Sequence, residues 1–214
     1  MENITTIPQL SAEEQRILGS LIEKSRATPE YYPMTINSII AACNQKSSRN
    51  PVVQYDEDTI TVTIDSLRKK GLVATVTGAG SRAVKYKHNL AVAYPLVPAE
   101  LTVLCLLLLR GPLTSGEINN NSNRLFNFES LEEVQEVLYN LLKSETPFIQ
   151  LIPKKSGQKE QRYIHLFGES AALEPSSKPE SGVSIDLENR VKHLEEEVQY
   201  LRSNLDKLLK ELMG

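Results

Sequence analysis

The stretch DEDTITVTIDSLRKKGLV, residues 56–73, predicts a helix that leads directly into a β-strand. Its apolar residues fall at the spacing of one buried helix face: Ile60, Ile64 and Leu67. Gly71 is typical of a helix end. A strand, a GAGS turn and a second strand are expected to follow, in LVATVT, residues 72–77, and RAVKYKH, residues 82–88.

The same pattern recurs later in the chain with different residues. SLEEVQEVLYNLLKS, residues 130–144, has apolar residues at the same offsets: Val134, Leu138 and Leu141. Two predicted strands follow here as well, in FIQLIP, residues 148–153, and QRYIHLF, residues 161–167. A helix followed by a β-hairpin is therefore predicted twice.

Two further helices are predicted before each of these segments. In the first copy they begin at the caps Ser11 and Thr35, and Ser11 forms a capping box with Glu14. In the second copy they begin near Pro98 and at Thr114. Three helices followed by a hairpin form the winged helix-turn-helix plan. We therefore expect an α+β, mainly helical fold with two tandem winged helix-turn-helix domains, at residues 10–92 and 93–167.

A different composition begins after the second copy. GESAALEPSSKPESG, residues 168–182, is rich in Ser, Pro, Glu and Gly and predicts a flexible linker. Residues 183–213 predict a coiled-coil helix that joins two chains in a parallel homodimer. Its apolar seam alternates spacings of four and three: Leu187, Val191, Leu194, Val198, Leu201, Leu205, Leu208 and Leu212. A lone helix folded back on the domains is the alternative, and other oligomers remain open.

Several motifs in the chain resemble those of a known family. They are TPEYYPMTINSIIAACNQKSSRNPV at 28–52, GAGSRAVKYKH at 78–88, LLLRGPLTSGE at 107–117 and RYIHLF at 162–167. Together they resemble the YceH-like bacterial proteins over about residues 10–167. The resemblance implies tandem winged helices and assigns no biochemical activity, so function must be argued from the residues.

Composition and motifs argue against catalysis and against a membrane protein. The chain has 214 residues, 24% of them charged, and a formal charge of −3. Cys43 and Cys105 lie in apolar helical runs, so we expect buried thiols and a reducing, cytoplasmic location. The histidines His88, His165 and His193 belong to no metal-ligand cluster, and no nucleophile motif is present. We expect no enzyme activity, no cofactor and no metal.

DNA binding is the usual role of this fold, through the third helix in the major groove. Here the first turns of both third helices are acidic and would repel phosphates: Asp56, Glu57 and Asp58 in one, and Glu129, Glu132 and Glu133 in the other. The cations lie on the wing and on the loop between helices two and three of the first domain: Lys46, Arg49, Arg82, Lys85 and Lys87. These residues could contact the DNA backbone, or the wing lysines could simply solvate the hairpin.

The loop AACNQKSSRNPVV, residues 41–53, is longer than its counterpart in the second copy. It is either a polar connector or a recognition loop in which Arg49 clamps a phosphate or carboxylate. From these patterns we expect a dimeric, DNA-associated transcriptional regulator that grips double-stranded DNA by this loop and the wing. The rival is a scaffold whose acidic third helices bind a protein partner.

Overall fold

A computed structural model describes residues 6–77, 83–154 and 160–168 of the chain. The chain divides into two compact units, Met1–Ala172 and Leu173–Gly214, and all described residues belong to the first. The linker expected from residue 168 is described only at Gly168. The coiled coil expected at 183–213, with its seam from Leu187 to Leu212, lies outside the described residues. Within the described part, no helix is both long and apolar enough to span a membrane.

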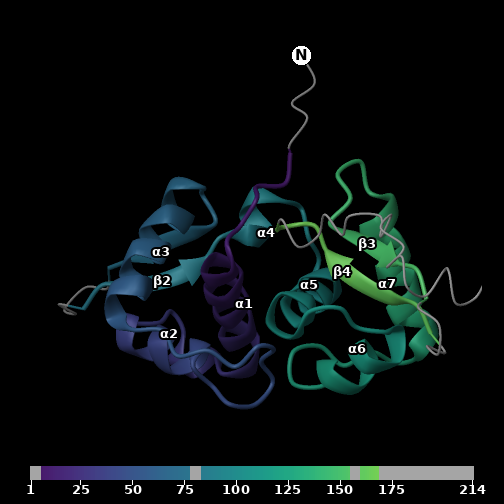
Figure 1. Cartoon of the computed structure of the whole chain (residues 1–214), viewed down its shortest axis with the longest axis horizontal. Coiled ribbons are helices and arrows are strands. Elements are labelled where there is room, and N and C mark those ends of the chain that lie inside the picture. The colour runs from purple at the N-terminus through teal and green to yellow at the C-terminus, as the bar shows by residue number, and fades with distance from the viewer. Residues whose placement is uncertain (1–5, 78–82, 155–159, 169–214) are drawn as a thin grey trace, which may run out of the picture. The chain divides into compact units, whose positions relative to one another are not determined.

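The described residues form two lobes with the same order of elements (Figure 1). The first lobe contains α1 (Ala12–Ala27), a 3-10 helix (Pro29–Tyr31), α2 (Ile36–Cys43), α3 (Glu57–Lys69), β1 (Val73–Val76) and β2 (Lys85–His88). The second contains α5 (Pro98–Arg110), α6 (Ser115–Ser122), α7 (Leu131–Lys143), β3 (Ile149–Ile152) and β4 (Arg162–His165). A short helix, α4 (Leu90–Ala93), joins them. The predicted mixture of helix and strand, mainly helical, is confirmed.

The helices begin where the capping residues predict. The Ser11 hydroxyl accepts from the Glu14 amide, and the Glu14 carboxylate accepts from the Ser11 amide, which completes the predicted capping box. Thr114 and Glu117 form the same box at α6. Each box satisfies two backbone N–H groups that the helix start would leave without a partner.

The two hairpins attach to their lobes in the same way. β1 pairs antiparallel with β2 and β3 with β4, and these form two separate two-stranded sheets. Met34 pairs with Tyr86 through two backbone hydrogen bonds, and Leu113 pairs with Tyr163 in the same manner. Met34 and Leu113 each directly precede the cap of their lobe's second helix. Each hairpin is therefore anchored to the helix pair, and the two lobes are built alike.

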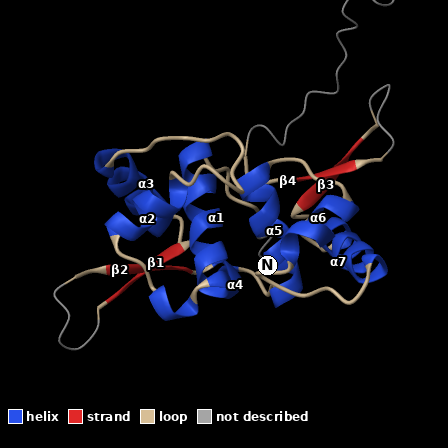
Figure 2. Ribbon diagram, turned by 90° about the horizontal axis from the view of Figure 1, so that it is seen from below, coloured by secondary structure: helices blue, strands red, loops and turns tan. Residues whose placement is uncertain are grey.

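Helices α1 and α5 pack against each other at the centre, with α2 and α3 on one side and α6 and α7 on the other (Figures 1 and 2). The pairing is close at Gly19, where an added Cβ would lie 2.9 Å from the Leu109 side chain. Nearly every residue of α5 is buried, as its continuous apolar run predicts. The hairpins lie on opposite sides of the α1–α5 pair (Figure 2).

Candidate functional site

The long loop between α2 and α3 is tied to its own lobe at both ends. The Asn44 side-chain amide donates to the Tyr55 carbonyl, and the Tyr55 amide donates to the Asn44 side-chain oxygen, both at 2.8 Å. The buried Arg16 guanidinium donates to the carbonyls of Cys43 and Pro51. These bonds replace regular secondary structure and hold residues 44–55 in a defined conformation.

Arg49 is a residue of this loop, and its side chain is 0% exposed. The guanidinium donates to both oxygens of the Glu23 carboxylate, at 3.0 and 2.6 Å, in a bidentate pair. It also donates to the carbonyls of Ala42 and Ser48. The expected contact of Arg49 with a DNA phosphate is therefore wrong: the residue clamps a carboxylate, but one that belongs to α1 of the same chain.

The pair changes the ionisation of Glu23. Burial raises the pKa of this carboxyl, but the hydrogen bonds and charge of Arg49, followed by the charge of Lys24, outweigh burial and hold the pKa below its usual value. Lys24 Nζ lies 3.3 Å from the same carboxylate. Glu23 is therefore ionised at neutral pH, and its charge is already balanced within the protein.

The extra length of the loop serves a contact with the second lobe. The Asn50 amide donates to the Leu109 carbonyl at 2.8 Å, and Arg110 Nη2 donates to Ser48 Oγ at 2.9 Å. Ser48 has a φ of 60°, a left-handed conformation that is uncommon for a serine. The loop is thus neither a plain connector nor a free recognition loop, because it joins one lobe to the last turn of α5.

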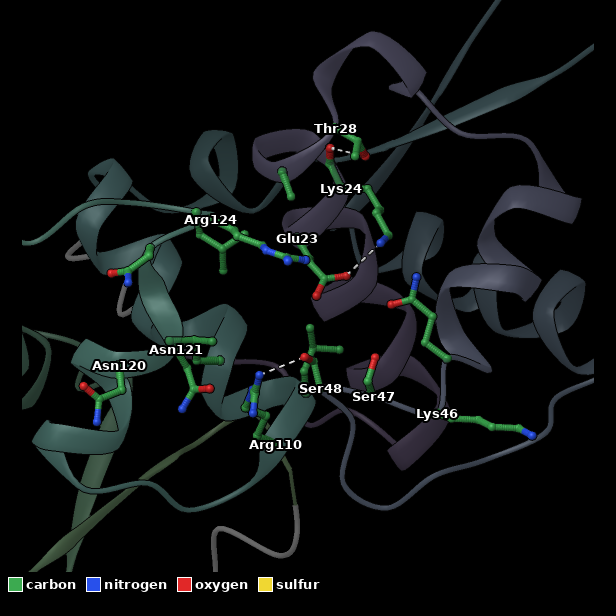
Figure 3. Close-up of a pocket in the computed structure, with 16 residues that line it drawn as sticks. Glu23, Lys24, Thr28, Lys46, Ser47, Ser48, Arg110, Asn120, Asn121 and Arg124 are labelled. Atoms are coloured by element: carbon green, nitrogen blue, oxygen red, sulfur yellow. Dashed lines mark hydrogen bonds and ion pairs between the residues drawn. The ribbon is translucent and has the colours of Figure 1, made fainter.

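A groove of about 1040 Å³ lies beside this junction (Figure 3). One wall comes from the end of α1 and the loop at Gln45–Ser48, and the other from the ends of α5 and α6 and the segment that follows α6. Its charged lining residues are Glu23, Lys24, Lys46, Arg110 and Arg124. Asn120, Asn121 and Asn123 add amides, and Leu106, Leu109 and Leu125 add apolar surface. Lys46 is exposed, and its side chain points away from the other labelled groups (Figure 3).

The β1–β2 hairpin, which is the first wing of the expected winged-helix plan, carries a separate set of cations. Lys87 is exposed and Lys85 partly so, two positions apart on β2 and therefore on one face of the strand. Burial lowers the pKa of His88 to about 4, and the charges of Arg26 and Lys87 contribute to the shift. Ser25 Oγ lies 3.2 Å from His88 Nε2, so the exposed Arg26 next to it at the end of α1 also lies near the end of β2. Arg82, the fifth expected contact residue, lies outside the described residues.

None of Arg26, Lys85 and Lys87 forms an ion pair with another described residue. On the second wing, by contrast, Arg162 binds the Glu117 carboxylate through both terminal nitrogens at 2.9 Å. That arginine joins the hairpin to the start of α6. In the part of the chain that is described, the first wing therefore has more cations without an ion pair than the second wing.

The acidic turns of the third helices are exposed, as expected. Asp56 caps α3 by accepting from the Thr59 amide at 2.9 Å, and Glu57 and Asp58 follow it at the surface. Capping explains Asp56, and the positive end of the helix dipole favours Glu57 and Asp58 in the first turn. In α7 the exposed face carries Glu132 and Glu136.

The buried titratable groups have structural roles. Burial lowers the pKa of His165 to about 4, so it is neutral at pH 7, as is His88. Burial raises the pKa of the Cys43 thiol to about 11 and that of Cys105 further. Among the described residues, no three His, Cys, Asp or Glu side chains are grouped as metal ligands.

Sequence patterns did not identify three of the cations, Lys24, Arg26 and Arg110. Each lies in the last turn of a helix, where a basic residue is ordinarily explained by the helix dipole. No further sequence signal distinguished them, because their importance depends on what lies opposite in the fold.

Known proteins share this sequence over most of its length. Residues 10–158 match the family described as "Protein of unknown function, DUF480". A UPF0502 protein of Shewanella baltica is 42% identical over 177 residues, which cover 81% of this chain and 79% of the relative. A UPF0502 protein of Geobacter metallireducens is 45% identical over 194 residues, 88% of each chain. The chain therefore belongs to the DUF480/UPF0502 family of bacterial proteins, which confirms the resemblance drawn from its motifs.

Proposed function

We propose that this chain is a non-enzymatic, DNA-associated protein with two tandem winged-helix domains, acting in the cytoplasm as a homodimeric transcriptional regulator. The repeated order of three helices and an anchored hairpin supports the winged-helix interpretation. The observation that carries the DNA interpretation is a group of cations at the first wing without an ion pair to any described residue: Lys85 and Lys87 on β2, with Arg26 near the end of that strand.

This proposal places the DNA contact on the wing and removes Arg49 from it. Cations on a wing contact phosphates, and phosphate contacts supply affinity and position without reading the bases. The exposed carboxylates at the start of α3 oppose insertion of that helix into the major groove. We therefore expect binding that depends strongly on salt and weakly on DNA sequence. Dimerisation through residues 187–212 would place two wings on one duplex.

Fluorescence anisotropy with two duplexes of unrelated sequence tests the proposal. We expect both duplexes to bind with similar affinity at low salt and to dissociate as salt rises. The variant Asp56→Asn/Glu57→Gln/Asp58→Asn should bind both more tightly, because it removes repulsion while the asparagine that replaces Asp56 can still cap the helix. Weaker DNA binding by this variant would argue against the proposal that the wing contacts the DNA while the acidic start of α3 repels it.

A protein-binding scaffold remains the second candidate, and the exposed face of α7 favours it. Tyr139 is 60% exposed there, one helical turn from Glu136 and two turns from Glu132. An exposed aromatic ring beside carboxylates is a suitable contact for a basic protein segment. If the chain is such a scaffold, neutralising α3 leaves DNA affinity negligible, and Tyr139→Ala removes the partner from affinity-purified complexes.

A further inference from the structure

The groove between the lobes holds more positive charge than its own contacts neutralise. Lys24, Arg110 and Arg124 line the groove with a single carboxylate, that of Glu23, and Lys46 lies at its edge with its side chain directed away. Glu23 already binds the buried Arg49, which lies outside the groove lining, and it also contacts Lys24. Arg124 is exposed and has no ion pair with any residue that the structure describes. The surplus charge favours an anionic ligand.

The remaining lining residues suit a ligand that is more than a simple anion. Gln45, Asn120 and Asn123 present amides, which both donate and accept hydrogen bonds, as the edge of a nucleobase requires. Leu125, in the segment after α6, is partly exposed and provides apolar surface for a flat ring, with the buried Leu106 and Leu109 behind it. In Figure 3 Asn120, Asn121 and Arg110 lie on the second-lobe side, while Lys24 and Thr28 lie on the first-lobe side.

The size of the groove fits a small molecule. Its volume of about 1040 Å³ is at the upper end of the ~300–1,000 Å³ typical of small-ligand pockets. The two walls include segments more than 70 residues apart, Gln45–Ser48 and Asn120–Leu125, and the Arg110–Ser48 hydrogen bond joins the first of them to the end of α5. A preformed, polar and cationic groove at a lobe boundary is a common setting for ligand binding.

We propose that this groove binds a nucleotide, with the phosphates at Arg124, Arg110 and Lys24 and the base against the amides and leucines. Because the groove shares no residue with the wing cluster, the nucleotide proposal and the DNA proposal can be tested independently of each other. A nucleotide here would touch both lobes and would therefore stabilise their junction.

Isothermal titration calorimetry on the full chain tests this proposal with ADP, GDP, CDP and UDP, each against its nucleoside. We expect at least one diphosphate to bind at low salt, and its nucleoside to bind at least tenfold more weakly. Arg124→Gln should weaken the diphosphate about tenfold or more, since it removes a charged hydrogen bond. Arg68→Gln is the matched control, because Arg68 is an exposed cation of α3 outside the groove, and it should change nothing.

A second variant distinguishes the contribution of the base to binding from that of the phosphates. Asn120→Ala should weaken the diphosphate but leave inorganic pyrophosphate binding unchanged, because the amide is assigned to the base. The proposal is overturned if no diphosphate binds at millimolar concentration, or if Arg68→Gln weakens binding as much as Arg124→Gln. It is also overturned if a trinucleotide binds tenfold more tightly than the nucleoside diphosphate, because the groove would then be a strand-binding surface. Unchanged binding of Lys87→Gln would confirm that the wing is not involved.

Discussion

Replacing Arg49 by methionine tests the corrected role of this residue. Methionine retains most of the apolar volume and removes the guanidinium, so the Glu23 carboxylate and the Ala42 carbonyl lose their buried donors. Removing one partner of a buried ion pair costs about 3–5 kcal/mol. Glu23 retains Lys24 at 3.3 Å and is 16% exposed, so we expect the lower end, about 3 kcal/mol of unfolding free energy.

Urea unfolding followed by circular dichroism measures this loss, and Lys46→Ala is the control. Lys46 lies three residues earlier on the exposed side of the same loop, so its removal should change the unfolding free energy by about 0.5 kcal/mol or less. Changing Glu23 to Gln together with Arg49→Met should recover part of the loss, because no buried charge is then left alone. A loss below about 1 kcal/mol for Arg49→Met, equal to that of the control, would refute the buried-pair account.

The effect should also depend on pH in a defined direction. The folded pKa of Glu23 lies below its ordinary value of 4.5, so the unfolded state takes up the proton first as pH falls. The stability that the pair provides is therefore complete above about pH 4.5 and is lost as pH falls through the folded pKa. The difference between wild type and Arg49→Met should be largest near pH 7 and should narrow as pH falls, because burial raises the pKa of the Glu23 carboxyl once Arg49 is gone, and the variant then takes up the proton first. A difference that widens as pH falls would contradict this assignment.

Two glycines, two buried histidines and the C-terminal segment provide further tests. Gly111 has φ 79° and ψ −153°, a region open essentially to glycine, so Gly111→Ala should lower the unfolding free energy by about 1–3 kcal/mol. Gly116→Ala, inside α6 with no close neighbour, should instead be neutral or stabilising by up to ~1 kcal/mol, as urea unfolding of both would show. NMR should give titration midpoints near pH 4 for His88 and His165. The unfolded state therefore takes up these protons first, so the contribution of each histidine to the unfolding free energy is complete above pH 6.5 and decreases as pH falls below it. A midpoint near 6.5 would show that the imidazole is solvated. Truncation after Gly182 should give a monomer by light scattering, because it removes the heptad seam, and a truncated dimer would contradict the coiled-coil prediction.

Local signals were sufficient to predict the helices and hairpins. The caps Ser11, Thr35, Asp56, Thr114 and Ser130 all precede helices, because a side-chain oxygen there satisfies the backbone whatever the rest of the fold does. The predicted strands are present as well, each shorter than predicted, although β2 ends at His88 as predicted.

The role of Arg49 could not be predicted in the same way. Its position among small polar residues is equally consistent with a surface clamp and with a buried pair. The difference is Glu23, which lies 26 positions earlier and meets Arg49 only after α1 and α2 pack together. The groove raised the same difficulty, because nothing local in the sequence indicates that the segment after α6, with Arg124, faces the first-lobe loop.

The most direct test of the DNA proposal is the salt dependence of affinity for wild type and for Lys85→Gln/Lys87→Gln. Each phosphate contact contributes about 0.9 to the slope of log K against log salt, so losing two should reduce the slope by roughly 1.8 for any duplex sequence. Fluorescence anisotropy at four or more salt concentrations gives both slopes. An unchanged slope in the double variant, or no binding by wild type at low salt, would contradict a phosphate-gripping wing.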